Sequence, residues 1–333
     1  MFWRSFLVKK ESSINIGKSK NFINTHRVSL KDLPPAAKNK IEWPWTKEIP
    51  VLSGSALRDA HWPKISIITP NYNYAHFLEE TIRSVLLQEY PNIEYIIIDG
   101  GSTDDSVKII KKYERWISYW ETTSDKGSAS AINRGFSKAT GEIFAWLNSD
   151  DLLMPGCLKS VGKIMLKNPK VDFLYGDRIN ADAETNFIGV HFSRSIIGRF
   201  HWAHCSPLAQ ECCFWRRRLH EKVGKLREDI KTIYDHDLFM RMWKKKGRFL
   251  KTKNFLGIYR NHQATLTNCK SDVMQQEIQK MIREEGIFTP DKMAPIVSFL
   301  IRLQYRYEQL SALLGRRVSA KRINGCWIWA ARE

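Results

Sequence analysis

KISIIT, residues 64–69, opens the part of the sequence that decides the fold: a short apolar run followed at once by a proline. Similar runs follow it, among them IEYIII at 93–98 and EIFAWL at 142–147. Segments with apolar residues at helical spacing, such as 77–88 and 128–139, separate them. Short strands that alternate with helices form βαβ units. We therefore predict an α/β fold with a mostly parallel central sheet of Rossmann-like βαβ units.

Polar residues stand directly after these predicted strands. Asn71 and Tyr72 follow the first, Asp99 follows the second, and Asp150 follows EIFAWL. Ligands of such sheets bind beyond the carboxyl ends of the strands. The chain has no GxGxxG after the first strand and no GxxxxGK[ST], which argues against a dinucleotide cofactor and against a P-loop. Carboxylates at strand ends favour a nucleotide whose diphosphate is bridged by a metal.

The formal net charge of +18 is concentrated after Asp150, where 33 of the 53 Lys and Arg residues stand against 18 of the 35 Asp and Glu residues. Such a basic segment favours an anionic partner: a diphosphate, a phospholipid surface or a nucleic acid. A nucleic-acid-binding protein would fit the charge and the interleaved aromatic residues. No RRM, helix-turn-helix or zinc-finger signature supports that alternative, so we expect no nucleic-acid partner.

No apolar run approaches the roughly 20 residues that a membrane span needs. We expect a cytoplasmic protein, with peripheral contact to an anionic membrane surface through its basic segment and the amphipathic stretch 296–314.

The six cysteines include no CxxC pair, and the start of the sequence has no secretory apolar segment, so we expect reduced cytosolic thiols. One cluster combines residue types that bind zinc, but its spacing matches no common structural zinc site, and buried thiols with ordinary histidines are the favoured interpretation. The cluster consists of His201, His204, Cys205, Cys212 and Cys213.

Seven motifs, in the same order along the chain, resemble those of family 2 inverting glycosyltransferases. Four are similar to the nucleotide-sugar half of that family: TPNYN (69–73), IIIDGGSTDDS (96–106), SDKG (124–127) and FAWLNSDD (144–151). Three are similar to its acceptor-side and closing motifs: QECCFWRR (210–217), YDHDLFMR (234–241) and YRNHQATLT (259–267). The resemblance implies the GT-A type nucleotide-diphospho-sugar transferase fold. It also implies inverting transfer of a sugar from a nucleotide-diphosphate donor to a hydroxyl of a glycan or lipid-linked acceptor, in surface polysaccharide or glycolipid biosynthesis.

The resemblance and the composition together predict three segments. Residues 1–63 are an N-terminal extended arm. Residues 64–267 are the glycosyltransferase domain, with 64–151 as its nucleotide-sugar-binding half and 152–267 as its acceptor half. Residues 268–333 are a basic, helical C-terminal extension.

On the donor side the resemblance implies a divalent metal, Mn²⁺ or Mg²⁺. Asp150 matches the second acid of the family's DxD-type motif, and Asn148 stands in place of the first. Asn148 can hydrogen-bond a ribose but supplies no charge. His262 is implied as a further metal or phosphate ligand. The alternatives are that Asp150 caps a helix and that His262 is an ordinary loop residue.

Tyr72 and Asp99 match family positions that hold the base, where the ring stacks and the carboxylate accepts a ring N–H. This favours a UDP- or dTDP-sugar, although Asp99 could instead be a turn residue. Lys126 is implied near the diphosphate, or else is solvated. Thr69 and Pro70 complete the implied nucleotide-sugar site.

Asp235 is the candidate catalytic base at a predicted helix start, where the family commonly has Glu-Asp and this chain has Tyr-Asp. Asp237 lies about 200° further round that helix, so the two cannot share one role. The alternative for Asp235 is a helix cap. The acceptor cleft is expected to include Gln210, Glu211 and Trp215, although Trp215 could equally be core. A catalytically inactive scaffold that binds a nucleotide sugar is a further alternative.

Overall fold

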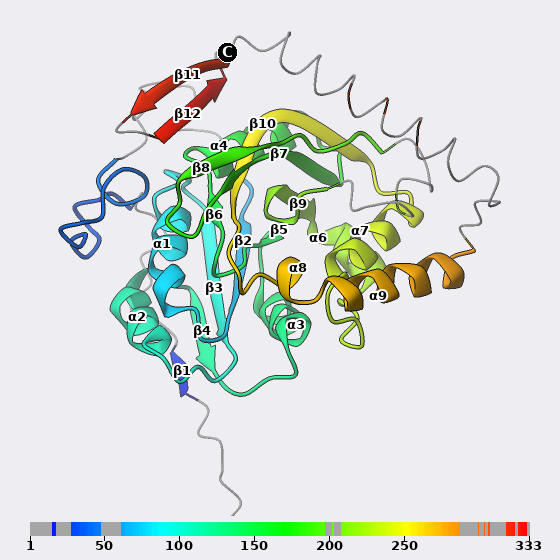
Figure 1. Ribbon diagram of the computed structural model, residues 1–333, viewed down its shortest axis with the longest axis horizontal. Helices are drawn as coiled ribbons and strands as arrows, with labels where there is room; N and C mark the ends of the chain where they lie inside the picture. The colour runs from blue at the N-terminus through cyan, green and yellow to red at the C-terminus, as the bar shows by residue number, and fades with distance from the viewer. Residues whose placement is uncertain are drawn as a thin grey trace, which may run out of the picture.

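The computed structural model describes most of the chain between residues 28 and 286 and short pieces elsewhere. The described residues are 15–17, 28–47, 61–196, 202, 208–286, 299, 303, 306, 318–323 and 326–331. Within them, ten strands join one sheet with helices on both faces (Figure 1). The predicted α/β fold is confirmed.

The centre of the sheet is parallel, in the order β4-β3-β2-β5. Ile65 of β2 lies opposite Ile93 of β3 and Ile143 of β5. Beyond β5, the antiparallel β9 connects to β7, which runs parallel to β10. The short β6 and β8 pair with β10 and β7. The strands are β1 (Asn15–Gly17), β2 (Ile65–Asn71), β3 (Ile93–Asp99), β4 (Tyr119–Thr122), β5 (Ile143–Trp146), β6 (Leu152–Leu153), β7 (Phe173–Ala181), β8 (Phe187–His191), β9 (Cys213–Arg216) and β10 (Phe249–Arg260).

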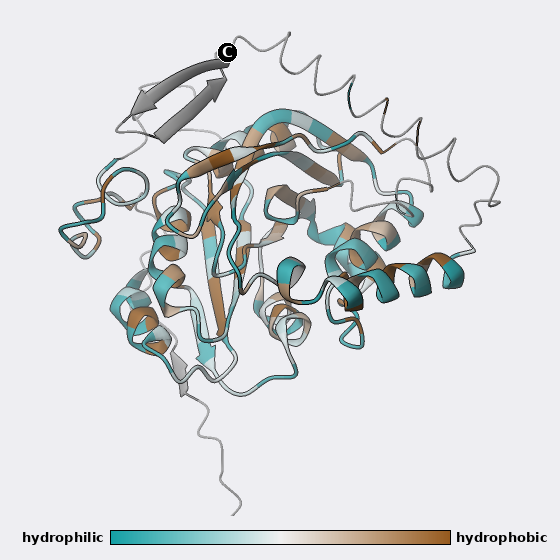
Figure 2. Cartoon of the chain, viewed as in Figure 1, coloured by the Kyte–Doolittle hydropathy of each residue, from teal (hydrophilic) through white to brown (hydrophobic). Residues whose placement is uncertain are grey.

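Alternate residues of the central strands point to opposite faces of the sheet and belong to two separate hydrophobic cores, one on each face. In β3, Tyr95 and Ile97 join the core under α1, α2 and α4, whereas Ile96 and Ile98 join the core under α3 and α7. Figure 2 shows long brown, apolar stretches along β2 and β3. A strand buried on both faces has a nearly continuous apolar sequence, as IEYIII does. The helices are α1 (Ala75–Leu86), α2 (Ser106–Tyr113), η2 (Glu114–Trp116), α3 (Ser128–Lys138), α4 (Cys157–Lys167), η3 (Gln210–Cys212), α6 (Arg217–Val223), α7 (Tyr234–Lys244), α8 (Leu266–Cys269) and α9 (Ser271–Glu284).

Residues 28–47 of the predicted arm are held against α1 by the buried Arg83. Its guanidinium donates hydrogen bonds to the carbonyl oxygens of Pro34 (2.8 Å) and Pro44 (3.1 Å). Trp43 also donates from Nε1 to the carbonyl of Leu153 (3.1 Å). These contacts attach the segment to the sheet domain, and the domain boundaries remain a prediction.

The expectation of a helical C-terminal extension holds for α9 but not for β11 (Val318–Ile323) and β12 (Cys326–Ala331), which pair antiparallel. The sequence signal for this hairpin is Asn324-Gly325, a dipeptide that favours two-residue hairpin connections, followed by the aromatic-rich CWIWA. Of the amphipathic stretch 296–314, only three residues belong to the described part of the chain. No helix within the described residues has both the length and the apolar character that a membrane span requires.

Candidate active site

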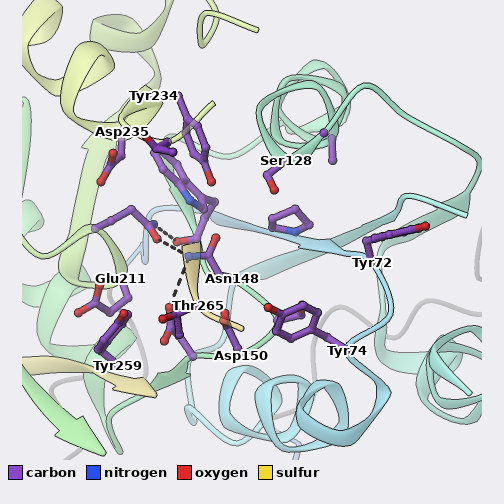
Figure 3. Close-up of a pocket in the computed structure, with 18 of the residues that line it drawn as sticks. Tyr72, Tyr74, Ser128, Asn148, Asp150, Glu211, Tyr234, Asp235, Tyr259 and Thr265 are labelled. Carbon is purple, nitrogen blue, oxygen red and sulfur yellow. Dashed lines mark hydrogen bonds between the residues drawn. The ribbon is translucent and has the colours of Figure 1, made fainter. Parts of the chain in front are cut away.

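A cleft of about 870 Å³ lies beyond the carboxyl ends of β2 and β5. Its walls come from the loops after these strands, from β7, from η3, from the start of α7 and from α9. Figure 3 shows Tyr234 and Asp235 on one side of the cleft and Asp150 and Tyr74 on the other. The predicted placement of the ligand site, at the strand ends, therefore coincides with the cleft.

The turn after β5 carries Asn148, whose side chain is oriented by a residue of η3. Asn148 Nδ2 donates to Gln210 Oε1 (3.2 Å), and Gln210 Nε2 donates to the carbonyl of Trp146 (2.8 Å). Among the described residues no hydrogen bond engages the Asn148 side-chain oxygen, which can therefore accept from a ligand in the cleft.

Asp150 meets His262, which follows β10. The two side chains lie 3.1 Å apart, Asp150 Oδ2 to His262 Nε2. The rings of Tyr74 and Phe77 pack against the imidazole, with centroids 5.8 Å and 4.6 Å from it. Tyr74 in turn donates its hydroxyl to the carbonyl of Ala264 (3.0 Å). A carboxylate and an imidazole are thus brought together at the cleft by two separate loops.

Arg260, at the end of β10, fixes the turn that carries Asp150. Its fully buried guanidinium pairs with Glu80 (3.0 Å) and donates from Nε to the Asp150 carbonyl, while its backbone N–H donates to Asp151 Oδ1 (3.1 Å). Burial, followed by the Asp150 charge, raises the pKa of Asp151 well above its ordinary value. Asp151 therefore stabilises the turn by accepting from the backbone of Arg260, whereas the neighbouring Asp150 contacts His262.

Asp235 is the second residue of α7 and lines the cleft. Among the described residues no ion pair engages it, and burial, with a smaller contribution from Glu211, raises its pKa to about 6. Asp237, two residues on, instead accepts from Arg241 Nε (2.8 Å). The two aspartates thus have different environments, as the helical offset predicts, and of the two only Asp235 belongs to the described lining of the cleft.

Strand β7 contributes a cationic side chain close to Glu211. Glu211 is buried, and Arg178 Nη1 lies 3.6 Å from its Oε1. The Arg178 guanidinium also lies over the ring of Tyr259, 4.5 Å from its centroid. All three residues line the cleft. Arg178 therefore offsets the charge of Glu211 on this side of the site.

The family model of glycosyl transferase family 2 matches residues 66–240, more than half of the chain. The chain is a family 2 glycosyltransferase. An uncharacterised glycosyltransferase of Nostoc sp. is 29% identical over 73% of this chain and 77% of that protein. TuaG of Bacillus subtilis, named for teichuronic acid biosynthesis, is 40% identical over 27% of this chain and 36% of its own length.

Solved GT-A glycosyltransferases share the fold. Staphylococcus aureus TarS 1–349 in complex with UDP-GlcNAc superposes with a TM-score of 0.54 at 17% identity, over 81% of this chain and 97% of that one. The mannosyltransferase of Pyrobaculum calidifontis, in complex with GDP-Man and Mn²⁺, gives 0.52 at 17% identity, over 76% and 74%.

In this glycosyltransferase the predicted donor residues divide into two groups. Pro70, Tyr72, Asn148 and Asp150 line the cleft, with Tyr72 58% exposed, and His262 contacts Asp150. Three others are absent from the described lining. They are Thr69, buried and hydrogen-bonded to Tyr95 (3.1 Å), the exposed Lys126, and Asp99.

Asp99 organises the loop after β3 in this structure. Its Oδ1 accepts from Asn71 Nδ2 (2.7 Å) and Ser102 Oγ (2.6 Å), and its Oδ2 accepts from Thr122 Oγ1 (2.5 Å) and from two backbone N–H groups. Both carboxylate oxygens are therefore occupied, and contact with a base would require one of these partners to move.

Gln210 and Glu211 line the cleft as predicted, but Trp215 does not. It is fully buried, stacked on Phe173 (5.9 Å between centroids) and edge-on to Trp146 (5.6 Å). The prediction that Trp215 binds the acceptor is therefore corrected: it belongs to the core beneath the cleft. An aromatic residue in a strand next to the site fits either environment, so the local sequence cannot separate them.

Tyr74, Asp125 and Ser128 also line the cleft, although no sequence pattern singled them out. Asp125 lies within the SDKG motif and Ser128 directly follows it, whereas Lys126 of the same motif is absent from the described lining of the cleft. Burial raises the pKa of Asp125 above its ordinary value. Tyr74 lies between the end of β2 and the start of α1. Its place just after a strand is the sequence feature that could have identified it as a cleft residue.

Cys212 and Cys213 of the zinc-type cluster are buried thiols that donate to the carbonyls of Asp177 and Ala209 (both 3.1 Å). Burial raises the pKa of both thiols, which disfavours the thiolates that zinc needs. Within the described residues no group of three metal-binding side chains occurs. The remaining members, His201, His204 and Cys205, lie outside the described residues.

Proposed function

We propose that this glycosyltransferase moves a sugar from a nucleotide-diphosphate donor to an acceptor hydroxyl with inversion, and that Asp235 is the base. The observation that carries the proposal is the partly buried Asp235, which no ion pair engages among the described residues, at the edge of a cleft whose opposite wall carries Asp150 (Figure 3). Inversion requires the hydroxyl to attack from the side opposite the leaving diphosphate, and its proton needs an acceptor on that side. Asp235 would receive that proton at a carboxylate oxygen as the new bond forms.

The charges of the cleft favour a bound cation together with the donor. Five carboxylic acid side chains line it among the described residues, of which Asp151 has a strongly raised pKa, and the one arginine there, Arg178, is already close to Glu211. His191 and His236 are neutral at physiological pH, because burial lowers the pKa of each to about 4. A diphosphate, which is itself anionic, would be repelled by such a lining unless its charge were offset.

Asp150 and His262 fit a divalent ion of the Mn²⁺ or Mg²⁺ kind. Such ions are held by one or two protein ligands, with water and substrate phosphates completing the coordination, so a pair of protein ligands is sufficient. The ion would neutralise the charge that develops on the leaving diphosphate. Asn148, held by Gln210, would accept a hydrogen bond from the ribose, and the exposed Tyr72 ring would stack on the base.

The donor base is proposed to be uracil or thymine. The fold shared with TarS, which was solved in complex with UDP-GlcNAc, supports a uridine donor. The mannosyltransferase that shares the fold was solved in complex with GDP-Man, so guanine is the alternative base that the test must include. The name of TuaG supports a role in surface polysaccharide synthesis.

The direct test is a transfer assay with a panel of nucleotide sugars, with Mn²⁺, Mg²⁺ or EDTA, followed by NMR of the anomeric carbon of the product. A metal-dependent product of inverted configuration supports the proposal. Retained configuration, or full activity in EDTA, contradicts it.

We also propose a cytoplasmic location with contact to anionic lipid, on the basis of the charge concentrated after Asp150. The protein should co-sediment with anionic vesicles and be released as salt is added. Equal recovery with neutral vesicles would contradict this proposal.

A further inference from the structure

The helix α9 lies outside the segment that the family model matches, yet it packs beside α7 and reaches the cleft (Figure 1). Met274 and Ile278, one turn apart, line the same cleft as Asp235, and Met281 is buried in the core cluster that also contains Leu238 and Phe239 of α7. The helix therefore forms part of the wall of the candidate active site.

Glu277 lies on α9 between these two lining residues and is bonded to the loop before α7. Its Oε1 accepts from the Lys231 N–H (2.6 Å). Its Oε2 accepts from Thr232, both N–H (2.9 Å) and hydroxyl (2.6 Å), and from the Ile233 N–H (3.4 Å). Burial alone would raise the pKa of Glu277, but these hydrogen bonds outweigh it and the pKa lies below its ordinary value. Glu277 is therefore charged at neutral pH, and hydrogen bonds to a charged acceptor are the stronger kind.

The loop that Glu277 holds is the one from which Asp235 is presented. Ile233 directly precedes α7, and its carbonyl accepts from the Asp237 N–H (3.0 Å), which closes the first turn of the helix. Asp235 lies inside that turn, two residues after Ile233. A displacement of the loop would therefore displace the carboxylate of Asp235, and a shift of about 1 Å in a reacting group can cost about 10²-fold in rate.

We infer that Glu277 is a positioning residue for Asp235: by holding the N–H groups of residues 231–233, it sets the place of the base relative to the acceptor. The inference rests on the proposed role of Asp235. Glu277 would act on turnover and not on donor binding, because its contacts are to the loop that presents Asp235 and not to Asp150 or Tyr72.

The test compares Glu277→Gln and Glu277→Ala with Glu284→Gln. Glu284 lies on the same helix and undergoes the same change of charge, but its partners are the side chains of Arg227 (3.4 Å) and Lys280 (3.7 Å) and not the N–H groups of residues 231–233. We expect kcat to fall about tenfold in Glu277→Gln, which keeps one acceptor oxygen, and about 10²-fold in Glu277→Ala. Donor affinity should change less than twofold in both variants, and Glu284→Gln should behave like the wild type.

Amide hydrogen exchange separates positioning from simple destabilisation. In Glu277→Gln the N–H groups of Lys231, Thr232 and Ile233 should exchange faster while the central strands keep their protection. The inference is overturned if kcat per folded molecule is unchanged, or if protection falls equally throughout the molecule.

Asp235→Asn, assayed in parallel, separates the two claims. If Asp235→Asn is inactive and Glu277→Gln turns over like the wild type, only the inference about Glu277 fails. If Asp235→Asn itself turns over normally, the proposed function of Asp235 fails.

Discussion

His262 Nε2 lies 3.1 Å from Asp150 Oδ2, although the two residues are 112 positions apart in the chain. The end of β10 brings them together, where the buried Arg260 bonds to the turn that carries Asp150. A DxD-like turn and a distant histidine thus form one unit at the edge of the cleft.

The first prediction is that Asp150 and His262 contribute unequally to metal-dependent donor binding. Asp150→Ala removes the charged ligand and should abolish the Mn²⁺-dependent part of donor affinity. His262→Ala should weaken it about 10- to 100-fold. Calorimetric titration with the donor, with and without Mn²⁺, measures both effects. The exposed Asp105 is a matched control, and Asp105→Ala should have no effect. Metal-dependent affinity that persists in Asp150→Ala would refute the ligand assignment.

The second prediction follows from the buried position of Trp215. Trp215→Ala should destabilise the fold by about 3–5 kcal/mol, as is typical of large-to-small aromatic replacements in a core. Trp215→Phe keeps most of the ring contacts and should leave the KM for the acceptor within twofold. Denaturant unfolding and acceptor kinetics measure the two effects. A stable Trp215→Phe variant with a strongly raised KM for the acceptor would contradict the core assignment and indicate that Trp215 binds the acceptor.

The third prediction concerns the buried pair of Arg260 and Glu80. Arg260→Met leaves Glu80 buried without its principal partner and should cost about 3–5 kcal/mol of unfolding free energy. The partly exposed pair of Arg218 and Asp172 is the control, and Arg218→Met should cost about 0–1 kcal/mol. Equal losses of unfolding free energy in the two variants would show that Arg260 does not stabilise the Asp150 turn more than a surface ion pair would.

The parallel centre of the sheet and the location of the site could be predicted because both follow from local patterns. Apolar runs such as IEYIII reveal strands buried on both faces, and the residue after each run stands at the edge where ligands bind. The offset between Asp235 and Asp237 was likewise correct, since helical geometry alone separates them.

The remaining features depend on contacts between distant parts of the chain. Thr232 and Glu277 are 45 residues apart, and a carboxylate that accepts from backbone N–H groups leaves no sequence motif. Whether Asp99 faces a base or its own loop depends on Asn71 and Thr122, which come from other strands. Trp215 illustrates the same problem for packing, because its burial is decided by Phe173 and Trp146.

The fourth prediction is a pH dependence of turnover. Burial raises the pKa of Asp235 to about 6, so the base is deprotonated above that pH and kcat should fall as the pH drops through about 6. The same raised pKa means that folding favours the protonated form, so the charged carboxylate destabilises the folded protein at higher pH. Asp235→Asn should therefore be at least as stable as the wild type at pH 8 by thermal unfolding. A flat profile of kcat between pH 5 and 8 would contradict the assignment.

The most direct measurement is the turnover of Asp235→Asn beside that of Asp237→Asn, with donor affinity determined for both. Asp235→Asn keeps the shape of the side chain but cannot take a proton, and kcat should fall about 10²–10⁴-fold while donor affinity stays near that of the wild type. Asp237→Asn changes an aspartate on the same helix that is bonded to Arg241, and its kcat should fall less than tenfold. The opposite result, an active Asp235→Asn and an inactive Asp237→Asn, would contradict the account.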